Sequence, residues 1–279
     1  MLHAFVWWFL FLALGVAALP VTFVLFRKLP DRGYGFSKAI GLLLFGYLYW
    51  VLVTAGILPN TRPAVVGVLV IVVVLALVVF RQRREPIVSF VRSRWKVLLA
   101  TELVFAAVFA LWGFIRSYTP DIAHTEQPMD FALLNGILRS VEFPPNDPWF
   151  SGESISYYYF GYLMTAGMTK VTGFASSISY NLALLSLAGM VATGTMSLVY
   201  GLVTSMRGAS GLRISFWQGL FFSVFGVVLL LFIGNLVGLL EFFQTNGIGP
   251  AWFWDWLSVD GVNGVSRGSS WYPDDNWWW

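Results

Sequence analysis

Two acidic residues, Glu126 and Asp130, lie four positions apart in a polar segment and are the first candidates for chemistry. The apolar residues that follow recur with the spacing of one helix face, at Phe131, Leu134, Ile137 and Leu138. Both acids are therefore predicted near the N-terminus of a surface helix, on its polar side. Such a pair can hold a divalent cation, Mg²⁺ or Mn²⁺, or one carboxylate can act as a base while the other orients it. The alternative is a solvated acidic face that the helix dipole stabilises.

A third carboxylate, Asp147, lies in the sequence FPPNDPW, where three prolines restrict the backbone. Stiffness in an exposed connection indicates that Asp147 is held in place, which suits a site residue. The alternative is an ordinary turn, because aspartate beside proline is common in turns.

Three consecutive tyrosines, Tyr157, Tyr158 and Tyr159, open the apolar stretch 155–172. Adjacent residues on a helix point about 100° apart, so at least one ring is expected to face protein or ligand. There its phenol can bind a phosphate or a sugar hydroxyl. The alternative is an interfacial belt, in which tyrosines lie at the level of the lipid head groups.

The composition of the whole chain is that of a polytopic membrane protein. Of its 279 residues, 58% are hydrophobic and 11% are charged, against about 25% charged in a soluble domain. A soluble fold of this size could not bury so much apolar surface, which excludes soluble enzymes, nucleic-acid-binding domains and disordered tails. The sequence has no cysteine and two histidines, which excludes disulfides, thiolate metal sites and histidine-rich metal centres.

Six apolar stretches are long enough to cross a bilayer as helices, which takes roughly 20 residues. They are residues 4–26, 38–58, 64–80, 97–115, 180–204 and 214–240. We therefore predict an all-α membrane protein with about six transmembrane helices. The shorter stretch 155–172 is expected to lie at the interface or to re-enter the membrane without crossing it, and seven crossings are the alternative.

The orientation follows from the basic residues, which concentrate in the connections 27–38 and 81–96. The positive-inside rule places both connections in the cytoplasm, so the N-terminus and the acidic segment 116–154 are expected outside. If 155–172 does not cross, the arginines of 205–213 join the cytoplasmic side. We expect a multi-pass protein of the plasma membrane whose partner is the lipid bilayer and not nucleic acid. Glu102, inside the fourth stretch, is expected to pair with Arg94 or Lys96 in a structural role.

Three motifs of the outside segment, in their order, resemble an uncharacterised membrane-protein family named "YYY" for its tyrosine triplet. They are PDIAHTEQPMDFALLN, FPPNDPW and GESISYYYFGY. The resemblance is close over 116–170 and loose over much of 97–279. It implies a YYY domain, 97–279, that we expect to continue beyond the last residue given. The first three apolar stretches form a separate three-helix N-terminal membrane segment, 1–96, which carries no motif of the family.

The YYY family is in turn similar to the GT-C membrane glycosyltransferases, which carry an acidic pair at the start of a surface helix in their first large outside loop. Asp130 stands in the place of that pair, but Phe131 follows it, so the second acid must be Glu126 or Asp147. The resemblance implies that a sugar moves from a polyprenyl-phosphate donor to an acceptor on the outer face. Asp130 would be the base or metal ligand, with Glu126 and Asp147 in support.

Such a transfer also needs positive charge for the departing phosphate. Arg116 and Arg139 are the candidates, because a guanidinium matches the geometry of a phosphate. The alternative function is a non-catalytic scaffold or a subunit of a larger membrane complex, with the aromatic loop as its docking surface. A transporter is disfavoured, because apart from Glu102 the apolar stretches lack the charges and broken segments that transporters use.

Overall fold

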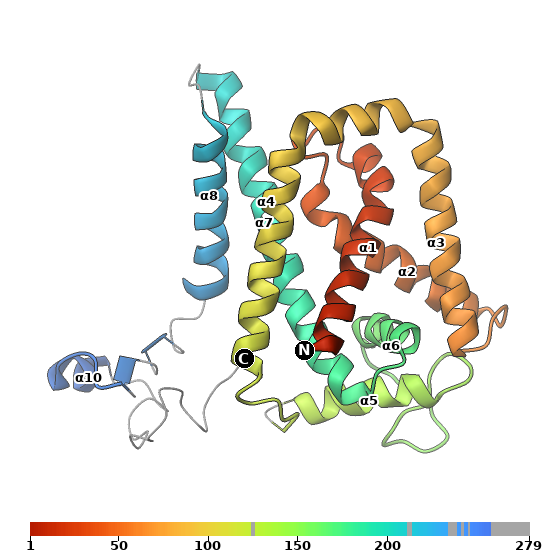
Figure 1. Cartoon of the computed structure of the whole chain (residues 1–279). Coiled ribbons are helices and arrows are strands. Elements are labelled where there is room, and N and C mark those ends of the chain that lie inside the picture. Colours follow the sequence, from red (N-terminus) through yellow and green to blue (C-terminus); the bar gives the residue numbers. More distant parts are fainter. Residues whose placement is uncertain (124–125, 211–213, 234–238, 241–242, 245, 258–279) are drawn as a thin grey trace. The chain divides into compact units, whose positions relative to one another are not determined.

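The computed structural model describes residues 1–123, 126–210, 214–233, 239–240, 243–244 and 246–257 (Figure 1). The chain divides into two units, Met1–Val227 and Val228–Trp279. The described part of the second unit includes the helices η2 (Leu229–Ile233) and α10 (Ala251–Leu257). The candidate site belongs to the first unit.

Six helices of the described residues are long and apolar enough to cross a membrane. They are α1 (Leu2–Leu25), α2 (Ser37–Thr54) with the short η1 (Tyr34–Phe36) before it, α3 (Arg62–Gln82), α4 (Arg84–Arg116), α7 (Ser176–Ser210), and α8 (Phe216–Val228) with η2 after it. Apart from an isolated bridge between Asn146 and Ser154, the described residues form no β-structure. The predicted all-α polytopic membrane fold is confirmed.

Two further helices, α5 (Gln127–Arg139) and α6 (Phe160–Thr172), have 13 residues each. A helix of that length is about 20 Å long, which is less than the hydrocarbon core of a bilayer. The stretch 155–172 therefore does not count among the spanning helices, as expected. Figure 1 shows α5 and α6 beside the N-terminus, at one end of the first unit.

The connections after α1 and α3 and the C-terminal end of α7 lie at the opposite end of the first unit (Figure 1). The segments 27–38, 81–96 and 205–213, whose described parts lie at this end, carry most of the lysines and arginines. Because α6 is too short to cross, one, three and five spanning helices precede these three places along the chain. After an odd number of crossings the chain is always on the same side. The described part of 205–213 therefore lies on the same side as 27–38 and 81–96, as predicted for six crossings.

A buried ion pair links α2 to α4 inside the first unit. The Nζ atom of Lys38 lies 2.5 Å from Oε1 of Glu102, and Lys38 is 2% exposed. The expectation that Glu102 pairs with Arg94 or Lys96 was wrong. Gly15 of α1 makes the room, because a Cβ atom there would lie 2.8 Å from Cγ of Lys38. A charged group away from water is stable only when an opposite charge pairs with it. Lys38 supplies that charge because its side chain reaches Glu102 inside the unit.

The C-terminal end of α5 is fixed by Asn60, in the connection between α2 and α3. The Asn60 amide donates hydrogen bonds of 2.7 Å to the carbonyls of Ile137 and Ser140. Lys170 of α6 donates to the carbonyls of Asn60 (2.8 Å) and Leu138 (3.2 Å), and burial lowers the pKa of Lys170. The last carbonyls of a helix lack partners within it, so these bonds hold α5 in one orientation.

Candidate functional site

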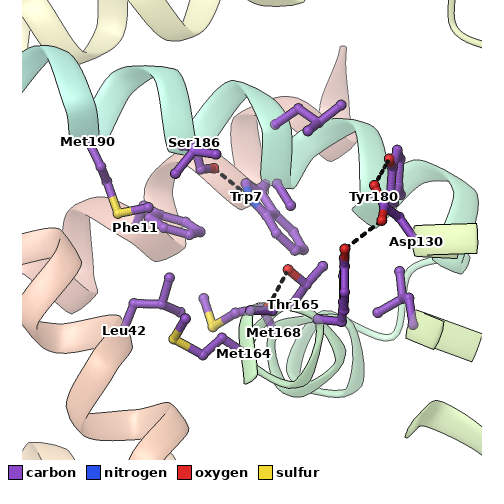
Figure 2. Close-up of a pocket in the computed structure, with 16 residues that line it drawn as sticks. Trp7, Phe11, Leu42, Asp130, Met164, Thr165, Met168, Tyr180, Ser186 and Met190 are labelled. Carbon is purple, nitrogen blue, oxygen red and sulfur yellow. Dashed lines mark hydrogen bonds between the residues drawn. The ribbon is translucent and has the colours of Figure 1, made fainter. Parts of the chain in front are cut away.

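Asp130 lies in the first turn of α5 and is partly buried. Its Oδ1 atom accepts a 2.5 Å hydrogen bond from the phenol of Tyr162 in α6. Its Oδ2 atom accepts a 3.3 Å bond from the phenol of Tyr180 in α7, as Figure 2 shows. The pKa of Tyr162 is raised above its usual value by burial first, and then by the bond to Asp130 and its charge. One carboxylate thus joins three helices.

A cavity of about 250 Å³ opens beside this carboxylate (Figure 2). Asp130 is the one charged side chain among its lining residues in the described part of the chain. The wall opposite is apolar, with Trp7, Phe11, Leu42, Met164, Met168 and Met190 among its members. The indole N–H of Trp7 already donates to the Ser186 hydroxyl at 2.8 Å. The cavity therefore suits an apolar group with a polar end that faces Asp130.

Arg116, the last residue of α4, lies close to the same turn of α5. Its Nε donates to the side-chain oxygen of Asn181 at 2.6 Å, and Nη2 donates to the carbonyl of Asp121 at 2.9 Å and to the side-chain oxygen of Gln127 at 3.2 Å. Gln127 shares the first turn of α5 with Asp130, and Asn181 follows Tyr180 in α7. The guanidinium is thus fixed by the elements that position Asp130.

A larger cavity, of about 910 Å³, lies among α1, α4 and α7 with Arg116 on its lining. Ser117, Ser177 and Asn181 supply its other polar residues, and the remaining wall is mostly apolar. The indole nitrogen of Trp8 on this wall is buried and has no hydrogen-bond partner. The cavity combines the surface that a lipid chain prefers with a cation on its wall.

Glu126 is the N-cap residue of α5, is exposed, and makes no side-chain capping bond. Its charge and that of Asp130 both act on Tyr157, whose pKa is raised to about 12, chiefly by the hydrogen bond with Tyr158 and then by desolvation. The structure therefore brings Glu126, Asp130 and the exposed tyrosines into one region. Among the described residues, no group of three or more histidine and acidic side chains could hold a metal ion.

Asp147 lies in a turn of the connection between α5 and α6. Its Oδ1 atom accepts hydrogen bonds from the backbone N–H groups of Trp149 (2.8 Å) and Phe150 (2.9 Å). This geometry is that of an Asx turn, and it accounts for the stiffness expected from the sequence. The observed contacts of Asp147 are therefore those of an ordinary turn, which was the alternative to a site residue in the sequence analysis.

Arg139 is the last residue of α5 and is exposed. It is nine residues from Asp130, which is about 13 Å along a helix. Of the two candidate arginines, the structure brings only Arg116 to the Asp130 end of α5.

The tyrosine triplet precedes α6, which begins at Phe160. The expectation that the triplet lies on a helix was wrong, because the preceding chain forms turns and an isolated bridge and becomes helical only after Tyr159. The rings of Tyr157 and Tyr158 have centroids 3.9 Å apart and hydroxyls 2.6 Å apart, and both are exposed. The hydroxyl of Tyr159 accepts a 3.0 Å bond from the indole of Trp50. Only Tyr159 is thus engaged with the helices.

Tyr162 and Tyr180, the two phenols on Asp130, are not among the residues singled out from the sequence above. Tyr159 is the N-cap residue of α6 and Tyr162 lies in its first turn. Their phenols contact Trp50 and Asp130 respectively.

A family model described as "uncharacterized membrane protein (DUF2298)" matches residues 44–279. The match covers α5, α6 and α7, and with them Asp130, Tyr162, Tyr180 and Arg116. No curated protein and no solved structure matches the chain.

Proposed function

The chain belongs to the DUF2298 family of uncharacterized membrane proteins, and we propose that it is a GT-C-like glycosyltransferase. It takes a sugar from a polyprenyl-phosphate donor on the outer face of the plasma membrane, where the end with α5 and the N-terminus lies. The observation that carries the proposal is the joint position of Asp130 and Arg116. A carboxylate and a guanidinium are fixed at one turn of α5, each on the wall of a largely apolar cavity.

The cavity lined by Arg116 fits the donor. A polyprenyl phosphate has a long apolar chain with a phosphate at its end, so it needs an apolar groove and a cation at the membrane surface. The α1–α4–α7 cavity offers both. Asn181, Gln127 and the Asp121 carbonyl hold the guanidinium in a fixed plane, and a positioned guanidinium binds phosphate better than a mobile one.

Asp130 is the proposed general base. In the transfer, the oxygen of an acceptor hydroxyl forms a bond to the anomeric carbon of the sugar. The bond from that carbon to the phosphate oxygen breaks, and its electron pair stays on the phosphate. The acceptor proton passes to the Asp130 carboxylate. Tyr162 and Tyr180 orient that carboxylate through their hydrogen bonds.

The exposed tyrosines supply a surface for the sugar in this proposal. Tyr157 and Tyr158 form a close, tilted ring pair near Glu126 and Asp130, and their hydroxyls can bond to sugar hydroxyls. In the alternative role of this pair, Glu126 and Asp130 would hold a divalent cation and Asp130 would not be the base, because Mg²⁺ is commonly held by one or two carboxylates together with substrate phosphates. Such a cation would supply further positive charge to the departing phosphate.

The test is mass spectrometry of lipid-linked sugars in a deletion strain that carries the full-length gene or one of its variants. We expect the donor to accumulate in the deletion strain and with Asp130→Asn, and to return to its normal level with the parent protein. Glu142→Gln is the matched control, because Glu142 is an exposed acid of the same outside segment. It is expected to restore the normal level.

Two results would overturn the proposal. Unchanged lipid-linked sugars in the deletion strain would exclude the transferase. Full restoration by Asp130→Asn would remove the proposed base and favour the scaffold instead.

A further inference from the structure

A third cavity, of about 650 Å³, lies at the end of the first unit that carries the basic connections. It is formed where the connection after α1, the early part of α4, the last turns of α7 and the beginning of α8 meet. Lys28, Arg94 and Lys96 line it, together with the serine and threonine residues Ser93, Thr204, Ser205 and Ser215. No residue of the proposed transferase site takes part in it.

The charged residues that line this cavity are all basic. No aspartate or glutamate is among its lining residues, and the one ion pair among the described residues is the buried Lys38–Glu102 pair. Asp31 is nearby in the same connection as Lys28, but its carboxylate accepts bonds from the N–H groups of Gly33 and Gly35 and from the Ser197 hydroxyl. None of the three cations forms an ion pair with a carboxylate of the described residues, although the charge of Asp31 acts on Tyr200 of the cavity wall.

The beginning of α8 adds to this positive potential. Ser215 and Phe216, at the N-terminus of that helix, line the cavity. Ser215 caps the helix, since its hydroxyl accepts from the N–H of Gln218 at 3.2 Å and its own N–H donates to the Gln218 side chain at 2.9 Å. The positive end of a helix dipole favours anions, and phosphates are common ligands there.

The positive-inside rule explains why these connections are basic, but it does not require a cavity. An orientation signal works with scattered lysines and arginines. Here three cations from two separate segments and one helix N-terminus line the same recess. Arg94 also lies against the phenol of Tyr200, which ties it to the wall.

We propose that this cavity is a binding site for a phosphate-bearing anion, with Arg94, Lys96 and Lys28 as its ligands. The chemistry fits the phosphodiester of an anionic phospholipid head group and also fits a free phosphate, because both present oxygens to charge-assisted donors. The exposed side chains of Trp95, on its wall, and of Trp217, next to the lining residue Phe216 in the chain, are of the type that anchors at the head-group level.

The experiment uses the full-length protein in two kinds of nanodisc, one of phosphatidylcholine alone and one of phosphatidylcholine and phosphatidylglycerol in equal parts. After detergent extraction, native mass spectrometry counts the phosphatidylglycerol retained per protein. In the phosphatidylcholine discs, calorimetry measures the binding of inorganic phosphate. The variant is Arg94→Gln with Lys96→Gln. The control is Arg83→Gln with Arg84→Gln, which removes the same charge from the junction of α3 and α4, outside the cavity.

We expect the parent and the control to retain phosphatidylglycerol or to bind phosphate, and the cavity variant to do so about tenfold more weakly. Retention of phosphatidylglycerol alone identifies a head group, whereas phosphate binding in the phosphatidylcholine discs identifies a soluble ligand. Thermal unfolding of each variant shows that it remains folded. Equal weakening by the control, or no binding of either probe by the parent, would overturn the proposal.

Discussion

The phenol of Tyr162 donates a 2.5 Å hydrogen bond to Oδ1 of Asp130, which lies 32 residues earlier in the chain. The bond joins the surface helix α5 to the short helix α6. It gives a partly buried carboxylate a fixed direction at the edge of an apolar cavity. An exposed acid on a solvated helix face would have no such partner.

Removal of this phenol is the first prediction. Tyr162→Phe leaves one oxygen of a partly buried carboxylate without its donor, so we expect a loss of about 1–3 kcal/mol in the free energy of unfolding. Tyr180→Phe should cost less, because its bond is longer, at 3.3 Å. Denaturant titration of the purified protein measures both. Tyr47→Phe is the control, since it removes an exposed phenol of α2, and an equal loss in that variant would contradict a specific role for Tyr162.

The second prediction separates the two candidate arginines. Arg116→Lys keeps the charge but loses the planar fork of donors, so we expect the KM for the polyprenyl-phosphate donor to rise about tenfold with a smaller change in kcat. Arg139→Lys, at the far end of α5, should leave both constants unchanged. Steady-state kinetics of the reconstituted full-length protein decides between them. A fall in kcat alone, or the same effect from both variants, would be inconsistent with phosphate binding by Arg116.

Features set by a short stretch of the chain could be predicted from the sequence, whereas contacts between residues far apart in the chain could not. Six spanning helices and the short α6 follow from the length of apolar runs, which is a property of each run by itself. The partner of Glu102 depends on the depth at which Lys38 enters the bundle and on the space beside Gly15. Tyr180 reaches Asp130 across 50 residues. Neither relationship leaves a pattern in the sequence near the residue concerned.

The third prediction concerns topology and uses the absence of cysteine from the chain. Single cysteines at Ser89 and Ser205, both exposed at the basic end, should react with a membrane-impermeant maleimide only from the cytoplasm. A cysteine at Ser151, in the exposed turn before the tyrosine triplet, should react only from outside. The reason is that α6 is too short to cross. If the cysteines at 151 and 205 react from the same side, then the chain crosses the membrane at α6 after all.

The last prediction concerns the phenol of Tyr157. Its hydrogen bond with Tyr158 is the main cause that raises its pKa from 10.0 to about 12. Tyr158→Phe removes that partner, so we expect the pKa of Tyr157 to fall back toward 10.0. The titration of the Tyr157 phenol is measured as the difference in tyrosinate absorbance between each protein and its Tyr157→Phe counterpart. Because the folded-state pKa is the higher one, the stability that this phenol contributes is complete below about pH 10 and is lost as the pH rises through about 12.

Tyr159→Phe is the control for this titration. Tyr159 accepts its bond from the indole of Trp50 and makes none to Tyr157 in the structure, so its removal should leave the titration of Tyr157 near pH 12. An unchanged titration in Tyr158→Phe would show that the two exposed rings are not paired in solution. The proposed sugar-binding surface would then lose its pair of rings, and the transferase proposal would depend on Asp130 and Arg116 alone.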